Sequence, residues 1–266
     1  IKVLVLDEAD LMLDLGFYKD IEDLIKYLPR HRQTLFFSAT INEKIKKLAY
    51  SIVRNAIRIQ ISPKDPVSKN VTHSVMFVSM DDKRFFLERI VNENPESRIL
   101  VFVRTKVRAE RVYEAMNRVG IKSQTMHGGK DQENRLEVMN GFKNGDFKLL
   151  IATDISARGV DIANVDYVVN YDLPDVAEIY VHRVGRTGRG NNKGVAVSFC
   201  SPEEKPVLDE IESFMDKKVT VLSVDKADYS ETLALTEDVN DNWKKLIADA
   251  EKEDNAYKGK KKKNKK

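Results

Sequence analysis

Short apolar runs alternate with longer amphipathic stretches along most of the chain. Runs rich in Val and Ile predict strands at residues 2–6, 34–37, 56–61, 73–78, 99–103, 123–126, 148–152, 167–170 and 194–200. The stretches between them predict helices, for instance over residues 83–92, 107–119, 132–143, 177–184 and 202–214. This alternation is typical of βαβ units, in which helices cover both faces of a parallel sheet. We therefore predict the α/β fold class.

A Pro-containing segment, SPKDPVSKN at residues 62–70, interrupts this pattern, and we assign residues 62–72 to a linker. Residues 1–61 contain three of the predicted strands and resemble the last part of an α/β domain, with a sheet edge and an apolar face left uncovered. Residues 73–224 contain enough strands and helices for a complete second α/β domain. The periodicity weakens over residues 225–266, whose Lys-rich terminus we expect to be disordered.

The composition is that of a soluble globular protein, with 42% hydrophobic and 33% charged residues in a chain of 266. The longest apolar runs have five or six residues. That is far short of the roughly 20 residues that a membrane-spanning helix needs. One Cys excludes an intramolecular disulfide, and the sequence shows no secretory signal after Ile1. Both features favour a cytoplasmic protein.

The net charge of +3 is unevenly distributed. Residues 258–266 supply seven Lys and no acid, so the remainder carries 3 − 7 = −4. A basic face for a polyanion must therefore be built locally. The tail can supply general affinity for nucleic acid, or it can act as a solubilising segment.

Three carboxylates, Asp7, Glu8 and Asp10, follow the first predicted strand in VLVLDEAD. Ligands of open α/β sheets bind beyond the carboxyl ends of the strands, so acids at that place face a ligand rather than the core. Such acids can hold Mg²⁺ through water and position an attacking water. The structural alternative is a solvated turn in which Asp10 caps the next helix.

Small hydroxyl residues end a second strand in TLFFSAT, at Ser38 and Thr40. Their hydroxyl groups can connect the carboxylates to a neighbouring domain. They can equally cap the helix expected to begin near Asn42.

Polar residues also follow the strand at residues 148–152, in the segment IATDISARGVD. They are Thr153, Asp154, Arg158, Gly159 and Asp161. Hydroxyl and backbone N–H groups suit a phosphate, Gly permits close backbone approach, and an acid suits a ribose hydroxyl. The alternative is a turn whose polar groups satisfy one another.

Three arginines, Arg183, Arg186 and Arg189, are spaced three apart in YVHRVGRTGRGNNKG. On a helix they would fall near one face. Arginine is always charged and binds in a bidentate fashion, so this group suits phosphate oxygens better than a folded core. The alternative is a solvated basic loop.

Two further strand ends carry residues that can meet a sugar-phosphate backbone. One set is Arg104, Thr105 and Lys106, and the other is His127, Gly128, Gly129, Gln132 and Arg135. Turns and helix caps account for both sets equally well. Cys200 lies in an apolar strand and is interpreted as core.

Several other kinds of site are unsupported. The sequence contains no G-x-x-x-x-G-K-[ST] loop, no G-x-S-x-G and no His/Cys cluster with zinc-ligand spacing. GRGNNKG, beginning at Gly188, precedes a strand instead of following one, so we reject it as a dinucleotide fingerprint.

Taken together, four of these motifs closely resemble, in order, those of the DEAD-box RNA helicases. They are DEAD at residues 7–10, SAT at 38–40, ATDISARGVD at 152–161 and HRVGRTGR at 182–189. The resemblance covers residues 1 to about 224 and implies RecA-like folds: one complete C-terminal domain and the end of a first, ATP-binding domain.

The resemblance also implies roles for individual residues. Asp7 would hold Mg²⁺ through water, and Glu8 would activate the water that attacks ATP. Arg186 and Arg189 would act as arginine fingers, and Gly159 and Asp161 would bind the nucleotide. Hydrolysis and unwinding would be coupled through Asp10, Ser38, Thr40, His182 and Arg183. RNA would be bound by Arg104, Thr105, Gly128, Gln132, Arg135 and Thr153.

The implied mechanism is closure of two RecA-like domains on ATP and RNA, which bends one strand and opens a short duplex. The family's P-loop should precede Ile1, so we expect this chain to be a fragment that hydrolyses ATP poorly or not at all. The competing hypothesis is a non-catalytic module that binds RNA or a partner with the same fold.

Overall fold

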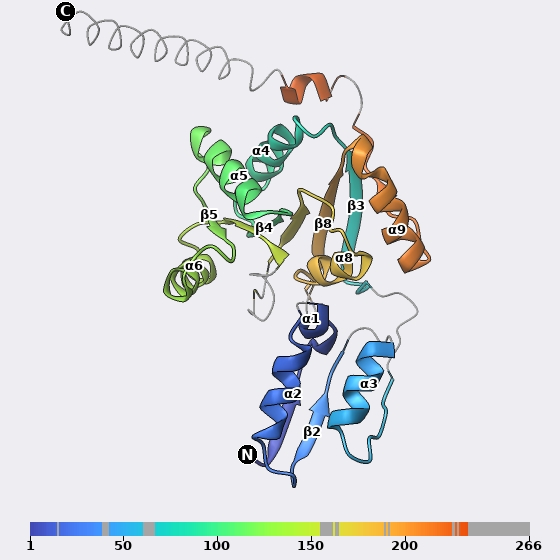
Figure 1. Cartoon of the computed structure of the whole chain (residues 1–266). Coiled ribbons are helices and arrows are strands. Elements are labelled where there is room, and N and C mark those ends of the chain that lie inside the picture. The colour runs from blue at the N-terminus through green and yellow to red at the C-terminus, as the bar shows by residue number, and fades with distance from the viewer. Residues whose placement is uncertain are drawn as a thin grey trace, which may run out of the picture. The chain divides into compact units, whose positions relative to one another are not determined.

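The computed structural model describes residues 1–14, 16–38, 43–60, 67–154, 162, 165–188, 190, 192–224, 227 and 229–233. The chain divides into two compact units, Ile1–Ser62 and Pro63–Lys266 (Figure 1). Every helix in the described ranges is too short or too polar to cross a membrane.

The first unit contains two parallel strands, β1 (Val3–Leu6) and β2 (Gln33–Phe36), which pair from Val3 opposite Gln33 to Leu6 opposite Phe36. Its helices are α1 (Ala9–Asp14), α2 (Tyr18–Lys26) and α3 (Glu43–Ile52). Leu6, Ile21, Leu48 and Ile52 form its buried core.

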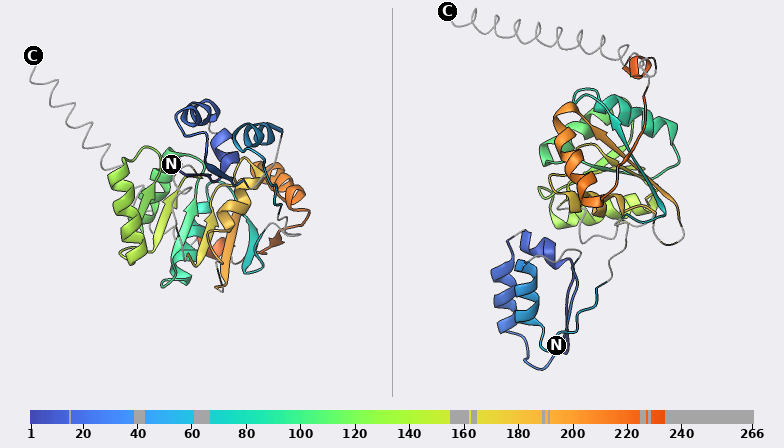
Figure 2. Two further views of the ribbon diagram at one scale, coloured as in Figure 1. Left: turned by 90° about the horizontal axis from the view of Figure 1, so that it is seen from below. Right: turned by 90° about the vertical axis from the view of Figure 1, so that its right-hand side faces the viewer.

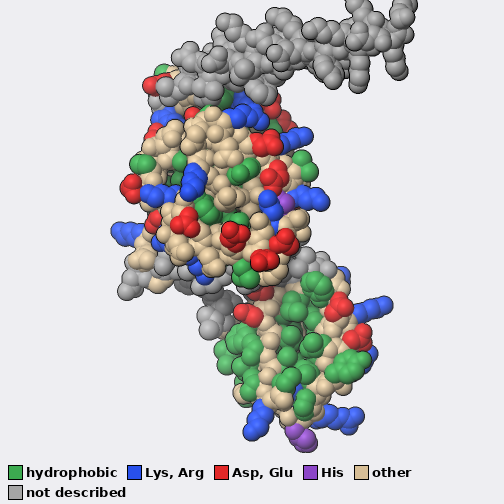
Figure 3. Space-filling model, turned by 90° about the vertical axis from the view of Figure 1, so that its left-hand side faces the viewer, with side chains coloured by type: hydrophobic (Ala, Val, Ile, Leu, Met, Phe, Trp, Pro, Cys, Tyr) green, Lys and Arg blue, Asp and Glu red, His purple; other side chains and the backbone are tan. Residues whose placement is uncertain are grey.

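Hydrophobic side chains also remain on the surface of this unit, where they gather on one face (Figure 3). Alternate positions of the two strands are exposed, with Val3 at 48%, Val5 at 52% and Leu35 at 36% of their full area, and Phe37, directly after β2, is 52% exposed. Successive side chains of a strand point to opposite faces, so one face of this small sheet covers the core and the other is bare. The uncovered apolar face expected from the sequence is therefore present.

One predicted strand is absent from this unit. Residues 56–60 carry the alternating pattern of a strand but form no ladder, and Ile57 and Ile59 are 88% and 82% exposed. A strand exists only where a neighbour accepts its hydrogen bonds, and the alternation alone does not provide one.

The second unit is a parallel sheet of seven strands in the order β5-β6-β4-β7-β8-β3-β9. The strands are β3 (Val71–Phe77), β4 (Ile99–Phe102), β5 (Ser123–Met126), β6 (Leu149–Ala152), β7 (Tyr167–Asn170), β8 (Gly194–Cys200) and β9 (Thr220–Val221). β3 begins at Val71, two residues inside the segment assigned to the linker, because Val71 pairs with Gly194 of β8.

Helices cover both faces of this sheet (Figure 2). They are α4 (Lys83–Glu93), α5 (Lys106–Arg118), α6 (Gln132–Asn144), α8 (Ala177–Val184) and α9 (Lys205–Met215), the last preceded by a short 3₁₀ turn at Pro202–Glu204. Alternate residues of β4 belong to different cores: Leu100 and Phe102 pack with α6, α8 and α9, whereas Ile99 and Val101 pack with α4 and α5. The predicted α/β architecture is confirmed.

Candidate functional site

The two strands of the first unit bring the DEAD and SAT motifs together. Beyond the ladder, the backbone N–H of Phe37 donates to the carbonyl of Leu6 at 2.8 Å, and that of Ala9 donates to the carbonyl of Phe37 at 3.1 Å. Asp7, Glu8 and Ser38 therefore lie at one edge, where the two parallel strands end. Thr40 lies outside the described residues.

The backbone turns sharply inside the acidic motif. Glu8 has a φ of +49°, a conformation that side chains rarely adopt and that costs roughly 1–2 kcal/mol. Asp7 stabilises the turn, since its Oδ1 accepts the N–H of Glu8 at 2.9 Å. Asp7 is exposed, whereas Asp10 is only 6% exposed within α1. The three carboxylates thus divide into one that faces solvent, one in a strained turn and one that is internal.

In the second unit, the predicted RNA-binding residues follow three strands that are neighbours in the sheet. The N–H of Val103 donates to the carbonyl of Ala152 at 3.0 Å, and the N–H of Thr153 donates to that of Met126 at 3.2 Å. The ends of β4, β5 and β6 therefore form one continuous edge. We call its members the strand-end row: Arg104, Thr105, Gly128, Gln132, Arg135 and Thr153.

The residues of the strand-end row differ in the contacts that they make. Thr105 is the N-cap of α5, and its hydroxyl accepts the N–H of Arg108 at 3.1 Å. Gln132 is the exposed first residue of α6 and accepts from Arg135 at 3.4 Å. A Cβ on Gly128 would meet nothing within 4 Å, so no packing in the described part of the chain requires a glycine there. The open space leaves Gly128 accessible to a ligand.

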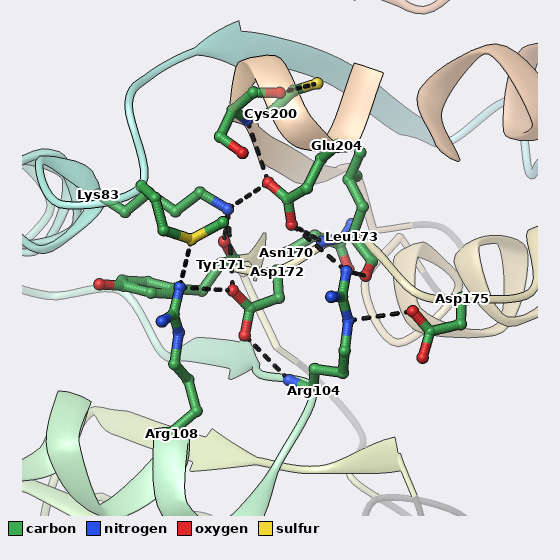
Figure 4. A network of polar contacts seen from close by, with 12 residues as sticks. Lys83, Arg104, Arg108, Asn170, Tyr171, Asp172, Leu173, Asp175, Cys200 and Glu204 are labelled. Carbon is green, nitrogen blue, oxygen red and sulfur yellow. Dashed lines mark hydrogen bonds and ion pairs between the residues drawn. The ribbon is translucent and has the colours of Figure 1, made fainter. Parts of the chain in front are cut away.

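Arg104 is tethered by a polar network that the sequence did not reveal (Figure 4). Its backbone N–H donates to the carboxylate of Asp172 at 3.0 Å. Its guanidinium contacts the carbonyl of Leu173 at 3.2 Å and the carboxylate of Asp175 at 3.1 Å. Behind it, the fully buried ammonium of Lys83 donates to Glu204 at 2.5 Å and to the carbonyl of Tyr171 at 2.7 Å. These contacts fix the direction of a side chain that is still 40% exposed.

A second cluster supports the turn at Gly128 and Gly129. His127 is 6% exposed, its Nε2 lies 2.6 Å from Glu110 Oε1, and its Nδ1 accepts the N–H of Gly129 at 3.1 Å. Burial alone would raise the pKa of Glu110. Hydrogen bonds from His127 and Thr125, together with the charge of Lys130, outweigh burial and hold that pKa below its ordinary value.

The condition under which the arginines would share a helical face is not met for Arg183 and Arg186. α8 ends at Val184, so Arg183 lies on the helix while Arg186 follows it, and they share no helical face. Arg183 is 2% exposed, and its Nε and Nη2 bind both oxygens of Asp154 at 2.6 and 2.8 Å. Its Nη1 donates to the carbonyl of Asp172 at 2.7 Å. The core accepts this charge because Asp154, 29 residues earlier in the chain, neutralises it.

The segment after α8 lies at the opposite end of the sheet from the strand-end row. Thr187 forms a bridge with Val165 just before β7, and a Cβ on Gly188 would meet Val71, the first residue of β3, at 2.6 Å. Arg186 is 9% exposed, and His182 is partly buried. Gly159, Asp161 and Arg189 lie outside the described residues.

Two family models match the chain. The model for DEAD/DEAH box helicases matches residues 1–48, and the model for the helicase conserved C-terminal domain matches residues 82–191. The chain therefore belongs to the DEAD-box helicase family.

Similar proteins support this assignment. The chain is 42% identical to the ATP-dependent RNA helicase DbpA of Bacillus subtilis, over 80% of this chain and 44% of that protein. It is 40% identical to the ATP-dependent RNA helicase RhlB of Shewanella pealeana, over 85% of this chain and 52% of that protein. The chain thus spans about half the length of the curated relatives that it matches.

The fold is also similar to that of S. cerevisiae Dbp5 bound to RNA and ADP BeF3. The TM-score is 0.78 at 32% identity, over 88% of this chain and 62% of that one. The RecA-like fold expected from the sequence is confirmed.

Proposed function

We propose that this chain is part of an ATP-dependent RNA helicase, in which ATP binding and hydrolysis between two RecA-like domains drive local unwinding of RNA. The observation that carries the proposal is the meeting of Asp7, Glu8 and Ser38 at one strand edge in a DEAD-box chain. Similar proteins named as RNA helicases, and one neighbour bound to RNA and ADP BeF3, support it.

Asp7 is suited to hold Mg²⁺ through water. No group of three or more His, Cys, Asp or Glu in the described ranges could hold a metal ion directly. Mg²⁺ instead prefers one or two carboxylates together with waters and substrate phosphates, and Asp7 is exposed at a strand end. The ion would neutralise charge on the phosphates. Glu8, beside it, would orient the attacking water and accept its proton.

The second unit would supply the remaining nucleotide contacts. Arg186 and Arg189 would stabilise the charge that develops on the transferred phosphoryl group, while Gly159 and Asp161 would meet the nucleotide. Arginines in this role are worth about 10³ to 10⁵ in rate. The sequence contains no P-loop, so this chain lacks the loop that would bind the β and γ phosphates of ATP. We expect turnover in the full-length gene product and not in this chain alone.

The strand-end row would bind the RNA backbone. Thr153 and Thr105 place hydroxyl groups along it, Gly128 leaves room for close approach, and Arg104 supplies a tethered charge. Phosphate contacts of this kind set position and affinity without reading the sequence.

Asp10, Ser38, Thr40, His182 and Arg183 would couple hydrolysis to unwinding. The buried ion pair gives Arg183 an indirect part, in which it positions Asp154 next to Thr153 of the row. A cytoplasmic location is part of the proposal, supported by the absence of any cysteine besides Cys200.

The test is RNA-stimulated ATP turnover of this chain, of the full-length product and of the full-length Arg186→Ala variant. Turnover at full length that the variant loses would support the split-site helicase. RNA binding without turnover in any of them would favour the non-catalytic module.

A further inference from the structure

A cavity of about 420 Å³ lies between α4 and α5, outside the strand-end row. Four arginines line it: Arg84, Arg108, Arg111 and Arg118. One carboxylate, Asp81, and apolar groups that include Met80 and Val112 complete the wall. Pockets of roughly 300 to 1,000 Å³ accept small ligands, so this one has room for a nucleotide-sized group. Because the body of the chain is mildly acidic, this concentration of positive charge is local.

Two of these arginines pair with carboxylates, while other guanidinium nitrogens around the cavity have no hydrogen-bond acceptor among the described residues. Arg108 binds Asp172 through Nη2 at 3.1 Å, and Arg118 pairs with Glu114 at 3.6 Å. The Nε atoms of Arg84 and Arg108 are buried, and each lacks a hydrogen-bond acceptor among the described residues. Arg111 is exposed and forms no hydrogen bond or ion pair within that part of the chain. Unused guanidinium donors around one cavity suit the oxygens of a phosphate.

A single carboxylate connects this cavity to the strand-end row. Asp172 accepts the N–H of Arg104 through Oδ2 and the guanidinium of Arg108 through Oδ1, so it lies between the two arginines (Figure 4). α5 starts directly after Thr105 and carries Arg108, Arg111 and Arg118. At a rise of 1.5 Å per residue, these three span about 15 Å of helix, which is long enough for more than one phosphate.

We propose that this α4–α5 arginine cavity binds phosphate groups of an RNA strand that continues past the strand-end row. This inference rests on the proposed function, because only an RNA strand that is bound along the strand-end row would place its next phosphates near Arg108. The apolar wall formed by Met80 and Val112 would lie against ribose or base.

The test compares binding of two lengths of oligouridylate, about 6 and about 15 nucleotides, over a range of salt concentrations. The variant is Arg84→Gln with Arg111→Gln. The matched control is Lys122→Gln with Lys143→Gln, which removes the same charge from exposed positions that do not line the cavity. Each lost phosphate contact lowers the salt slope for single strands by about 0.7, so the cavity variant should lose about 1.4 with the long strand. It should match the wild type with the short strand, and the control should match it with both.

Three results would overturn the inference. They are equal losses in cavity and control variants, equal losses with short and long RNA, or unchanged binding in the cavity variant. The proposed function survives all three, because the wild type still binds RNA. If the full-length wild type binds neither RNA in the presence of ATP, the proposed function fails, and so does the proposal that RNA occupies the cavity. A pyrophosphate titration followed by the Nε–Hε resonances of Arg84 and Arg108 would then show whether the cavity instead binds free phosphates.

Discussion

Arg183 and Asp154 form a bidentate ion pair inside the second unit, with N–O distances of 2.6 and 2.8 Å. The Arg183 side chain is 1% exposed, and its guanidinium carbon lies 5.1 Å from the centre of the Phe102 ring. A motif that suggests phosphate binding by its spacing thus contributes one of its arginines to the core. The pair links the last turn of α8 to the end of β6.

Replacing Arg183 by Ala should destabilise the second unit strongly. Removing one partner of a buried pair leaves the other charge uncompensated, at a cost of about 3–5 kcal/mol. Urea unfolding would measure the loss. The control is Lys205→Ala, which breaks an exposed pair with Asp209, a kind of contact that contributes little to stability. Similar losses in both variants would contradict a supporting role for the Arg183 pair.

Gly188→Ala should be far more damaging than Gly145→Ala. Both glycines have positive φ, +65° and +83°, so both variants incur about 1–2 kcal/mol of backbone strain. A Cβ on Gly188 would also lie 2.9 Å from the carbonyl oxygen of Asn70, whereas one on Gly145 would meet nothing within 4 Å. The difference between their melting temperatures reports the clash alone, and equal melting temperatures would refute it.

The buried pair of Lys83 and Glu204 should show strong coupling. Lys83→Met leaves the Glu204 and Asp172 carboxylates without their buried cation, so we expect a loss of about 3–5 kcal/mol. Adding Glu204→Gln removes one of these charges, and the double variant should be more stable than Lys83→Met alone. A double-mutant cycle measures the coupling, expected within about 0.5–3 kcal/mol. Strict additivity of the two single effects would count against the pair.

Glu110 should contribute to stability in a pH-dependent way. Its pKa in the folded chain lies below the ordinary value of 4.5, so the unfolded chain binds its proton more tightly. The contribution is therefore complete above pH 4.5 and is lost as the pH falls through the folded pKa. The stability difference between wild type and Glu110→Gln should shrink over that range. The exposed Glu137→Gln variant serves as control, and a constant difference for Glu110→Gln would disprove the linkage.

Cys200 should resist thiol reagents in the native state. Burial raises the pKa of its thiol to about 11, and the side chain is 0% exposed. As the chain has one Cys, labelling kinetics report this site alone. The labelling rate should rise over the same range of urea concentrations that unfolds the second unit. Rapid labelling without urea would show that the site is open in the folded protein.

The sequence by itself determined the α/β class, most strand positions and the places where polar residues end strands. These properties are local, because apolar periodicity and turn residues act within a few positions of the chain. It also predicted that Asp7 and Glu8 would lie where a parallel strand ends, and the structure places them at the carboxyl end of β1. Because the carboxyl ends of parallel strands share one edge, β4, β5 and β6 deliver the predicted residues to a single row.

Tertiary structure alone decided which charges became part of the core. The partners of Arg183 and Lys83 lie 29 and 121 residues away, so no local pattern marks these side chains as buried. Sheet order decided that the ends of β5, β6 and β4 would be adjacent, and that Thr187 and Gly188 would lie at the other end of the sheet. Within the described part of the chain, residues 56–60 are paired in no ladder, and alternation alone does not make a strand. Charge pairing and strand pairing are long-range interactions, and the folded chain alone brings their partners together.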